Sequence, residues 1–269
     1  MAGRVTGKVA FITGAARGQG RSHAIRLAEE GADIIAIDIC QDYDTVGYGL
    51  STEADLAETV KLVEALDRRI IARRADVRDA GALKAIVDEG VAELGKLDIV
   101  VANAGICTVQ AWDEVTPAVW QDTLDTNLTG VWNTMVAGAP HLIANGGGSI
   151  IATSSTAGIK GLPYLAPYVA AKHGVVGIAR TMANELAAHK IRVNTVHPTG
   201  VDTPMGAGLG GLEPLLTRDP NLGPIFMNTL PVEMVDARDI SNAVLFLASD
   251  EARYVTGLEF TVDAGNTIR

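Results

Sequence analysis

Seven short, mostly apolar runs recur along this chain, and longer stretches with helical spacing separate them. The runs are rich in Val and Ile and end near Gly, Asp or Ser, as strands of a parallel sheet buried on both faces do. They are VAFIT (9–13), DIIAID (33–38), RIIARRAD (69–76), LDIVVANAG (97–105), SIIATSS (149–155), IRVNTVHP (191–198) and LEFTVDAG (258–265). Between them, apolar residues three and four positions apart place one helix face on the sheet. The alternation predicts a single doubly wound α/β domain of the Rossmann type, residues 1–269, with a seven-stranded parallel sheet.

Composition and charge narrow the classes of protein that this chain can belong to. The 269 residues carry a formal net charge of −10, with a pI of about 4.9. Nucleic acid and anionic membrane surfaces both require a basic face, so neither is an expected partner. Cys40 and Cys107 form no disulfide framework and no zinc-ligand spacing, so no metal is expected. The chain has no signal-like segment at its start and no run of about 18 apolar residues, so a cytoplasmic protein is expected.

The glycine-rich segment TGAARGQG (13–20) lies between the first apolar run and the first helical stretch. Glycines there permit a tight turn, and the exposed N–H groups of a helix start suit a pyrophosphate. The spacing is TGxxxGxG, because His23 stands where GxGxxG has its third glycine. Asp38 ends the second run, 18 residues after Gly20, where an acid binds a ribose 2′-hydroxyl and repels a 2′-phosphate. These features predict NAD rather than NADP, and Arg17 is interpreted as a solvated side chain rather than a phosphate ligand.

Further motifs follow this segment in a specific order. They are Asp76–Val77, NAG (103–105), Asn127 in DTNLTG, Ser155, Tyr168, Lys172 and PTGVDTPM (198–205). In their order and spacing the chain resembles the short-chain dehydrogenase/reductase family over nearly its whole length. The resemblance implies an NAD-dependent oxidoreductase that interconverts a secondary alcohol and its ketone by hydride transfer.

Tyr168 and Lys172 stand four positions apart, and therefore on one face of a helix. A free phenol has a pKa near about 10 and is a poor base at neutral pH. A nearby ammonium, together with the positive nicotinamide ring, favours the phenolate, so Lys172 and the cofactor are expected to lower the pKa of Tyr168. Tyr168 would then take the proton of the alcohol and return it in reduction. Tyr164 does not have this spacing, because the residue four positions after it is Tyr168.

The resemblance also implies roles for the other matched residues. Ser155, in preference to Ser154, would hydrogen-bond the substrate oxygen, Lys172 would also anchor the nicotinamide ribose, and Asn127 would hold a water that links Lys172 to solvent. Asp76 and Val77 would lie at adenine. The residues expected to contact the cofactor are Gly14, Arg17, Gly18, Gln19, Gly20, Asp38, Asp76, Val77, Asn103, Ala104, Gly105, Tyr168, Lys172, Pro198, Thr199, Gly200, Val201 and Thr203.

Residues 39–52 make a longer connection after Asp38 than a compact member of this family has. Thr52 and Asp55 have capping-box spacing and predict a helix start. The apolar face of that helix is Leu56, Val60, Val63 and Leu66. With TGAARGQGRSHA, the connection resembles the carveol-dehydrogenase-like branch, which includes the mycofactocin-coupled oxidoreductases of actinobacteria. That branch implies a tightly held NAD and an external redox carrier, so the insert is expected to clasp the dinucleotide. The alternative is that residues 39–52 form an ordinary surface loop with no role in holding the cofactor.

Residues 200–235 interrupt the strand–helix pattern with an irregular stretch rich in Gly and Pro. Long connections of this kind are typical of lids over binding sites. The apolar residues here are Met205, Leu209, Leu212, Leu215, Leu216, Phe226 and Met227. They predict a substrate lid for an apolar, terpenoid-like alcohol of the carveol type or its ketone. A homotetramer is implied by the resemblance.

Two other functions remain open at this point. One is a short-chain reductase of keto or acyl substrates whose cofactor exchanges freely. The other is a non-catalytic protein that senses NAD. Sensing proteins on this fold often lack the tyrosine or the lysine, and this chain has both Tyr168 and Lys172.

Overall fold

A computed structural model describes residues 3–208 and 211–269 of the chain. Seven strands form one parallel sheet: β1 (Val9–Thr13), β2 (Asp33–Asp38), β3 (Ile70–Arg74), β4 (Ile99–Ala102), β5 (Gly148–Thr153), β6 (Ile191–Pro198) and β7 (Glu259–Val262). Their order is β3-β2-β1-β4-β5-β6-β7, so the winding reverses between β1 and β4. The predicted doubly wound parallel fold is thereby confirmed, and ligands bind such sheets at the reversal point, beyond the carboxyl ends of the strands.

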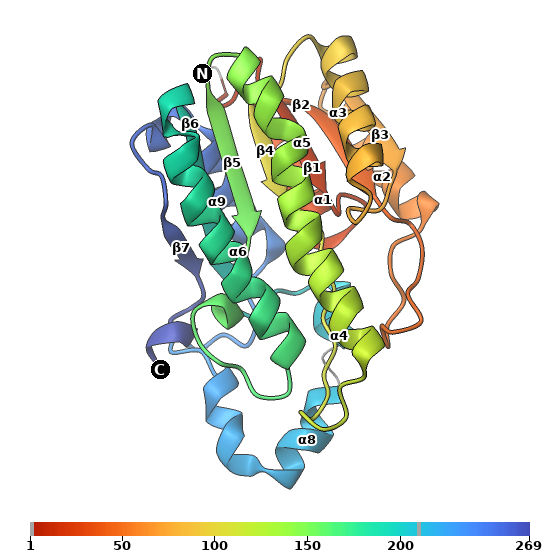
Figure 1. The fold of residues 1–269 in the computed structure, drawn as a ribbon, viewed down its shortest axis with the longest axis vertical. Helices are drawn as coiled ribbons and strands as arrows, with labels where there is room; N and C mark the ends of the chain where they lie inside the picture. The colour runs from red at the N-terminus through yellow and green to blue at the C-terminus, as the bar shows by residue number, and fades with distance from the viewer. Residues whose placement is uncertain (1–2, 209–210) are drawn as a thin grey trace.

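The long helices cover both faces of the sheet (Figure 1). One face carries α3 (Ala80–Leu94), α5 (Gly130–Ala144) and α6 (Ala166–Glu185), and the other carries α1 (Gly18–Glu29), α2 (Glu53–Glu64) and α9 (Ala237–Ala248). Neighbouring residues of one strand pack against opposite helix layers: Phe11 belongs to the core beneath α3, α5 and α6, and Ile12 to the core beneath α1, α2 and α9. Burial on both faces explains why the strands read as continuous apolar runs. Within the described ranges, no helix is long and apolar enough to cross a membrane.

Shorter elements lie mostly at the carboxyl edge of the sheet. They are α4 (Pro117–Leu124), the π-helical turn η1 (Asp125–Thr129), η2 (Thr156–Gly158), η3 (Ala187–His189), α7 (Pro204–Gly208), α8 (Leu212–Arg218), η5 (Pro220–Phe226), η6 (Asp250–Ala252) and η7 (Asn266–Ile268). The π-helical turn joins α4 to α5, and such turns are frequent at functional sites. The predicted lid contains α7, α8 and η5, which extend beyond the sheet (Figure 1). Its residue Leu209 lies outside the described residues.

Helix α2 begins as predicted and buries Leu56 and Val63 of its predicted face, but not Leu66. Thr52 and Asp55 form the full capping box, with the Thr52 side chain accepting from the Asp55 N–H. The prediction that Leu66 belongs to the apolar face is wrong, because Leu66 follows the helix and is 38% exposed. Thr59 is buried instead, and its hydroxyl donates to the carbonyl oxygen of Ala15 at 2.9 Å. A polar contact with the glycine loop, which apolar spacing cannot report, thus fixes this helix.

Candidate active site

Two adjoining cavities lie at the carboxyl edge of the sheet. The first is lined by Gly14, Arg17, Gly18, Gln19, Gly20, Asp38, Asp76, Val77, Asn103, Ala104 and Gly105, among others. The second is lined by Ser155, Tyr168, Lys172, Pro198, Thr199, Gly200, Val201 and Thr203, among others. Gln19, Asn103, Gly105 and Thr203 border both cavities. Every predicted site residue except Asn127 therefore lines one continuous cleft.

The glycine loop has the backbone geometry of an anion cradle. Gly14 has a φ of +67°, a left-handed conformation that glycine adopts without strain. A methyl group on Gly20 would lie 2.0 Å from the Gly14 carbonyl oxygen, so the loop closes directly onto the start of α1. That helix begins after Arg17 with no side-chain cap, and the buried Oε1 of Gln19 has no hydrogen-bond partner among the described residues. These uncapped N–H groups suit the pyrophosphate of a dinucleotide.

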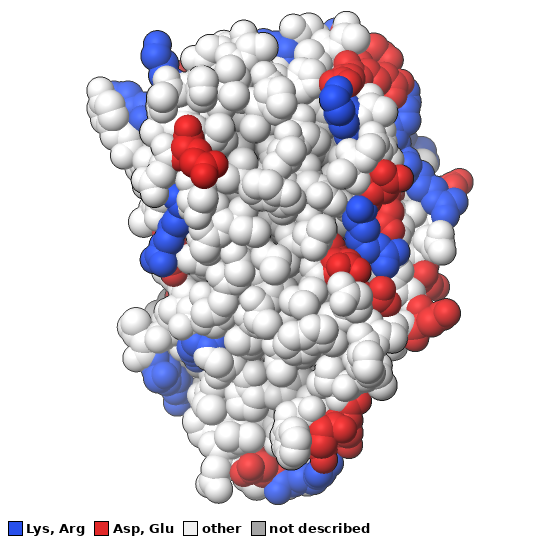
Figure 2. Space-filling view, in the orientation of Figure 1, with Lys and Arg blue, Asp and Glu red and all other residues white. Residues whose placement is uncertain are grey.

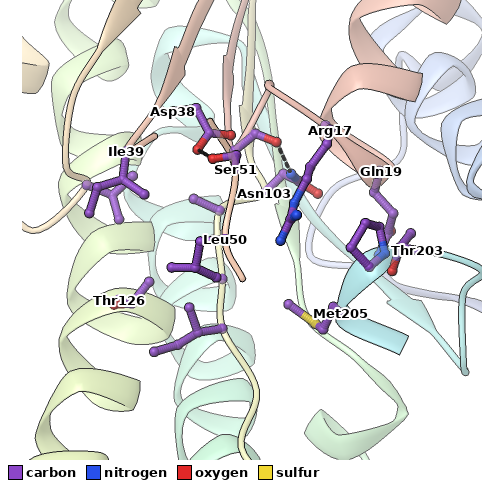
Figure 3. Close-up of a pocket in the computed structure, with 18 of the residues that line it drawn as sticks. Arg17, Gln19, Asp38, Ile39, Leu50, Ser51, Asn103, Thr126, Thr203 and Met205 are labelled. Carbon is purple, nitrogen blue, oxygen red and sulfur yellow. Dashed lines mark hydrogen bonds between the residues drawn. The ribbon is translucent and has the colours of Figure 1, made fainter. Parts of the chain in front are cut away.

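Asp38 ties the glycine loop to the 39–52 insert. Its carboxylate is only 8% exposed and accepts from the Ala16 N–H at 2.9 Å and from the Ser51 hydroxyl. Figure 3 shows Ser51 beside this carboxylate. Arg17, which was interpreted as a solvated side chain, is partly exposed, and its Nη2 donates to the Gly49 carbonyl oxygen at 2.5 Å. Asp38, through Ser51, and Arg17, through Gly49, thus hold the insert against the first cavity.

The middle of the insert, at Thr45 and Tyr48, is anchored on the other side of the cleft. Thr45 donates its hydroxyl hydrogen to Asp122 of α4 at 2.7 Å. The Tyr48 hydroxyl oxygen accepts from the N–H of Cys107 at 3.3 Å, and Tyr48 lines the first cavity. In Figure 1 this connection, between β2 and α2, reaches toward the α4 end of the molecule. The insert therefore spans the cleft from Asp38 to the segment that follows β4.

Tyr168 and Lys172 lie together on α6 at the second cavity. The Lys172 Nζ is 5.4 Å from the centroid of the Tyr168 ring and donates to the Thr153 carbonyl oxygen at 2.7 Å. Lys172 is 2% exposed, and burial lowers its pKa to about 8. Burial also raises the pKa of Tyr168, while a hydrogen bond with Ser155 lowers it by less. The predicted lowering of this pKa by Lys172 and the positive nicotinamide ring of bound NAD stays a prediction.

The two neighbouring serines have different surroundings. The Ser154 hydroxyl is buried and donates to the backbone carbonyl of Lys172 at 3.0 Å. Ser155 is only partly buried, and its hydroxyl oxygen accepts from the N–H of Ala157 at 3.1 Å, which leaves its own hydrogen free to donate. His197, which the motifs did not indicate, places its Nδ1 2.8 Å from the Ser155 carbonyl oxygen. Since a carbonyl only accepts, this nitrogen carries the hydrogen and fixes the backbone of Ser155.

Asn127 lies behind the cleft rather than on its wall. Its buried amide accepts from the Ile106 N–H at 2.8 Å and donates to the Ile106 carbonyl oxygen at 2.7 Å. A methyl group on Gly105 would lie 3.1 Å from its Oδ1 and 3.8 Å from the Lys172 Nζ. The side chain therefore clamps the NAG segment next to the lysine. Its predicted role in holding a water stays a prediction.

The loop after β6 is fastened to the end of the 200–235 segment. Thr199 donates its hydroxyl hydrogen to the Asn228 Oδ1 at 2.8 Å. The Asn228 amide in turn donates to the carbonyl oxygens of Val232 at 2.9 Å and Glu233 at 3.2 Å. Asn228 is a second residue that the motifs missed, because its only signal is a buried polar side chain in an irregular segment. Across the described ranges, no group of His, Cys, Asp and Glu side chains has metal-binding geometry.

The sheet order, the glycine loop and the cavity at the carboxyl edge of the sheet are those of a Rossmann-type protein. A family profile described as enoyl-(acyl carrier protein) reductase matches residues 14–267. The (-)-trans-carveol dehydrogenase of Rhodococcus erythropolis is 50% identical over 99% of each chain. A crystal structure of carveol dehydrogenase from Mycobacterium avium in complex with NAD is 54% identical, with a TM-score of 0.93 over 99% of this chain and 100% of that one. A short chain dehydrogenase from Mycobacterium paratuberculosis bound to NAD is 50% identical, with a TM-score of 0.97 and the same coverage. The chain belongs to the short-chain dehydrogenase/reductase family, as the motifs predicted.

Proposed function

We propose that this protein is an NAD-dependent dehydrogenase that interconverts a secondary alcohol and its ketone by hydride transfer. The observation that carries the proposal is the position of Ser155, Tyr168 and Lys172 on a cavity that joins the glycine-loop cleft. Relatives named carveol dehydrogenase, and similar structures that contain NAD, support it. The Asp38 carboxylate beside the glycine loop favours NAD, because a 2′-phosphate there would be repelled.

Each polar group of the second cavity has a proposed task. Bound NAD supplies the nicotinamide carbon that accepts hydride and a positive charge near the phenol. Ser155 donates its hydrogen to the substrate oxygen and holds it in place. Burial raises the pKa of Tyr168 and so favours the protonated phenol, which gives its proton to a ketone oxygen in reduction. In oxidation the phenolate form of Tyr168 takes the proton of the alcohol. Lys172 lies beside the ring, where its charge favours the phenolate that takes the alcohol's proton in oxidation and that is left when Tyr168 gives its proton in reduction.

A screen of secondary alcohols with a dye acceptor, in the presence of NAD or NADP, tests this function. We expect an apolar, carveol-type alcohol to be oxidised, with kcat/KM about a hundredfold higher for NAD because of the like charge of Asp38. Preference for keto or acyl substrates with freely exchanging cofactor would instead support the reductase alternative. Tight NAD binding without turnover of any alcohol would support the sensing alternative.

We propose further that residues 39–52 clasp the bound NAD, so that its electrons leave through an external redox carrier. The bonds from Ser51 to Asp38 and from Tyr48 to Cys107 support this role, since they attach the second half of the insert to β2 and to the segment after β4. Stoichiometric NAD is expected in the denatured, purified protein by mass spectrometry. If no NAD is found, the insert would instead be interpreted as a surface loop that does not retain the cofactor.

Ser51→Ala tests the clasp directly. A hydrogen bond to a charged group contributes about 1.5–3 kcal/mol, so we expect NAD to dissociate about ten- to a hundredfold faster. The dissociation rate is measured by exchange of bound NAD against labelled NAD. Thr6→Ala, which removes an exposed hydroxyl bonded to the Gly3 carbonyl oxygen, is the control and should leave the rate unchanged. Equal rates in the two variants would contradict the clasp.

The apolar walls support an apolar substrate, and the exposed apolar helices support assembly. Leu162, Leu165, Leu212, Phe226 and Met234 line the second cavity, and the 200–235 segment is proposed as its lid.

Figure 2 shows a broad uncharged face over α5 and α6, where Trp132 and Val136 are each 43% exposed. A homotetramer that covers this face is proposed. Cys40 and Cys107 are free thiols, which is consistent with the proposed cytoplasmic location.

A further inference from the structure

Charge is very sparse in the wall of the second cavity. Of the described residues that line it, only Lys172 and Glu233 carry ionisable charge at neutral pH. The Lys172 amine faces the carbonyl oxygen of Thr153 and lies beside the catalytic ring. Glu233 is exposed and forms no ion pair with any residue that the structure describes. Glu233 both lines the cavity and is exposed, so this residue without a described counter-ion lies at the rim of a largely apolar cavity.

The backbone holds Glu233 at this position. Its carbonyl oxygen accepts from the Asn228 amide, which is bonded to Thr199 of the loop after β6. The next residue, Met234, packs against Gly200, where a methyl group would lie 3.3 Å from its Cγ. Glu233 is thus tied through a buried asparagine to the loop on which the nicotinamide end is expected to rest.

Two cations near this wall, Arg269 and Lys160, are bonded to backbone carbonyls, and the Arg269 Nη1 donates to the Asn228 carbonyl oxygen at 2.7 Å. Lys160 donates from its Nζ to the carbonyl oxygens of Ile225 at 2.7 Å and Asn266 at 2.6 Å. Asp263 also acts on it electrostatically. An anionic ligand would therefore enter past a carboxylate, with no described arginine or lysine in the cavity wall beyond the catalytic lysine.

We infer that Glu233 is a specificity-determining residue that excludes anionic substrates and reserves the cavity for uncharged alcohols and ketones. The inference rests on the proposed function and sets its substrate class. Apolar walls lower the local dielectric constant, so a charge at the mouth acts more strongly than it would in water. Carboxylates and phosphate-bearing acyl carriers are repelled, whereas a terpenoid-like alcohol is not.

Two ring alcohols of similar size test this inference: a cyclohexanol with an isopropyl substituent and the same cyclohexanol with a carboxylate. The measured quantity is kcat/KM for the anionic alcohol divided by kcat/KM for the neutral one, with the NAD-loaded enzyme and a dye acceptor. Glu233→Lys is expected to raise this ratio by about tenfold or more at low salt. Added salt should raise the ratio in the original protein, by screening repulsion, and lower it in the lysine variant, by screening attraction.

The control is Glu64→Lys, which makes the same charge change at the exposed end of α2. An equal rise of the ratio in both lysine variants, or no rise in Glu233→Lys, would overturn the inference and leave the proposed function intact. If Glu233→Lys fails to fold, Glu233→Gln replaces it. The glutamine variant should raise the ratio about threefold and lose the salt dependence, and a ratio and salt dependence equal to the original would again overturn the inference. No dye reduction with the neutral alcohol in the original protein would overturn the proposed function itself.

Discussion

Replacing Tyr168 with phenylalanine is expected to lower kcat/KM for the alcohol by about a hundred- to ten-thousandfold, the contribution of a positioned general acid–base group. The ring is kept, so its packing beside Lys172 is kept as well, and NAD binding should change little. Only the hydroxyl that exchanges a proton with the substrate oxygen is lost. Steady-state kinetics with the best alcohol from the screen, together with fluorescence titration of NADH, would measure both quantities.

Tyr164→Phe is the matched control for this variant. Tyr164 lies four residues before Tyr168 and has the same side chain. The only described bond of its hydroxyl is a 3.4 Å donation to the Leu215 carbonyl oxygen. We expect the loss of this long, partly buried bond to change kcat/KM by less than about threefold. The assignment of Tyr168 would be refuted if its phenylalanine variant kept the activity of the Tyr164 variant.

Much of the fold was predictable because burial on both faces leaves a strong signal. A strand such as DIIAID must be apolar nearly throughout to lie between two helix layers, and β2 occupies that place. The face of α2 was predicted less well, since Leu66 is apolar but lies past the helix end, whereas Thr59 is polar but buried. Apolar periodicity detects hydrophobic contacts only. A threonine that is buried to bond a carbonyl leaves no such pattern.

The candidate site shows the same division between local and long-range information. The spacing of Tyr168 and Lys172 on one helix is local, so the sequence sufficed to bring them together. Electrostatics depends on what surrounds them, and the pKa of Tyr168 is raised because neighbours from several segments bury it. The bonds from Arg17 to Gly49 and from His197 to Ser155 join residues far apart in sequence, so no motif contained them.

The second large effect is expected at Gly20, where alanine should weaken NAD binding by about ten- to a hundredfold. A methyl group there would lie 2.0 Å from the Gly14 carbonyl oxygen and 2.9 Å from the Asn103 Nδ2. Neither neighbour can yield freely, because Gly14 makes the turn of the loop and the Asn103 amide donates to the Thr13 carbonyl oxygen at 3.0 Å. Such overpacking costs about 1–3 kcal/mol, and the glycine loop must shift away from the pyrophosphate position to relieve it.

Calorimetric titration of NAD into protein freed of nucleotide would measure this loss, with circular dichroism to confirm that the variant is folded. Gly47→Ala is the control, because the same methyl group on Gly47 would meet nothing within 4 Å, although Gly47 belongs to the insert over the same cleft. We expect the Kd of the control to equal that of the original protein. A Gly20→Ala protein that binds NAD equally well would show that the start of α1 does not hold the pyrophosphate. In that case the close approach of Gly14 to Gly20 would serve only the packing of the loop on its helix. The cofactor would then have to bind elsewhere along the carboxyl edge of the sheet.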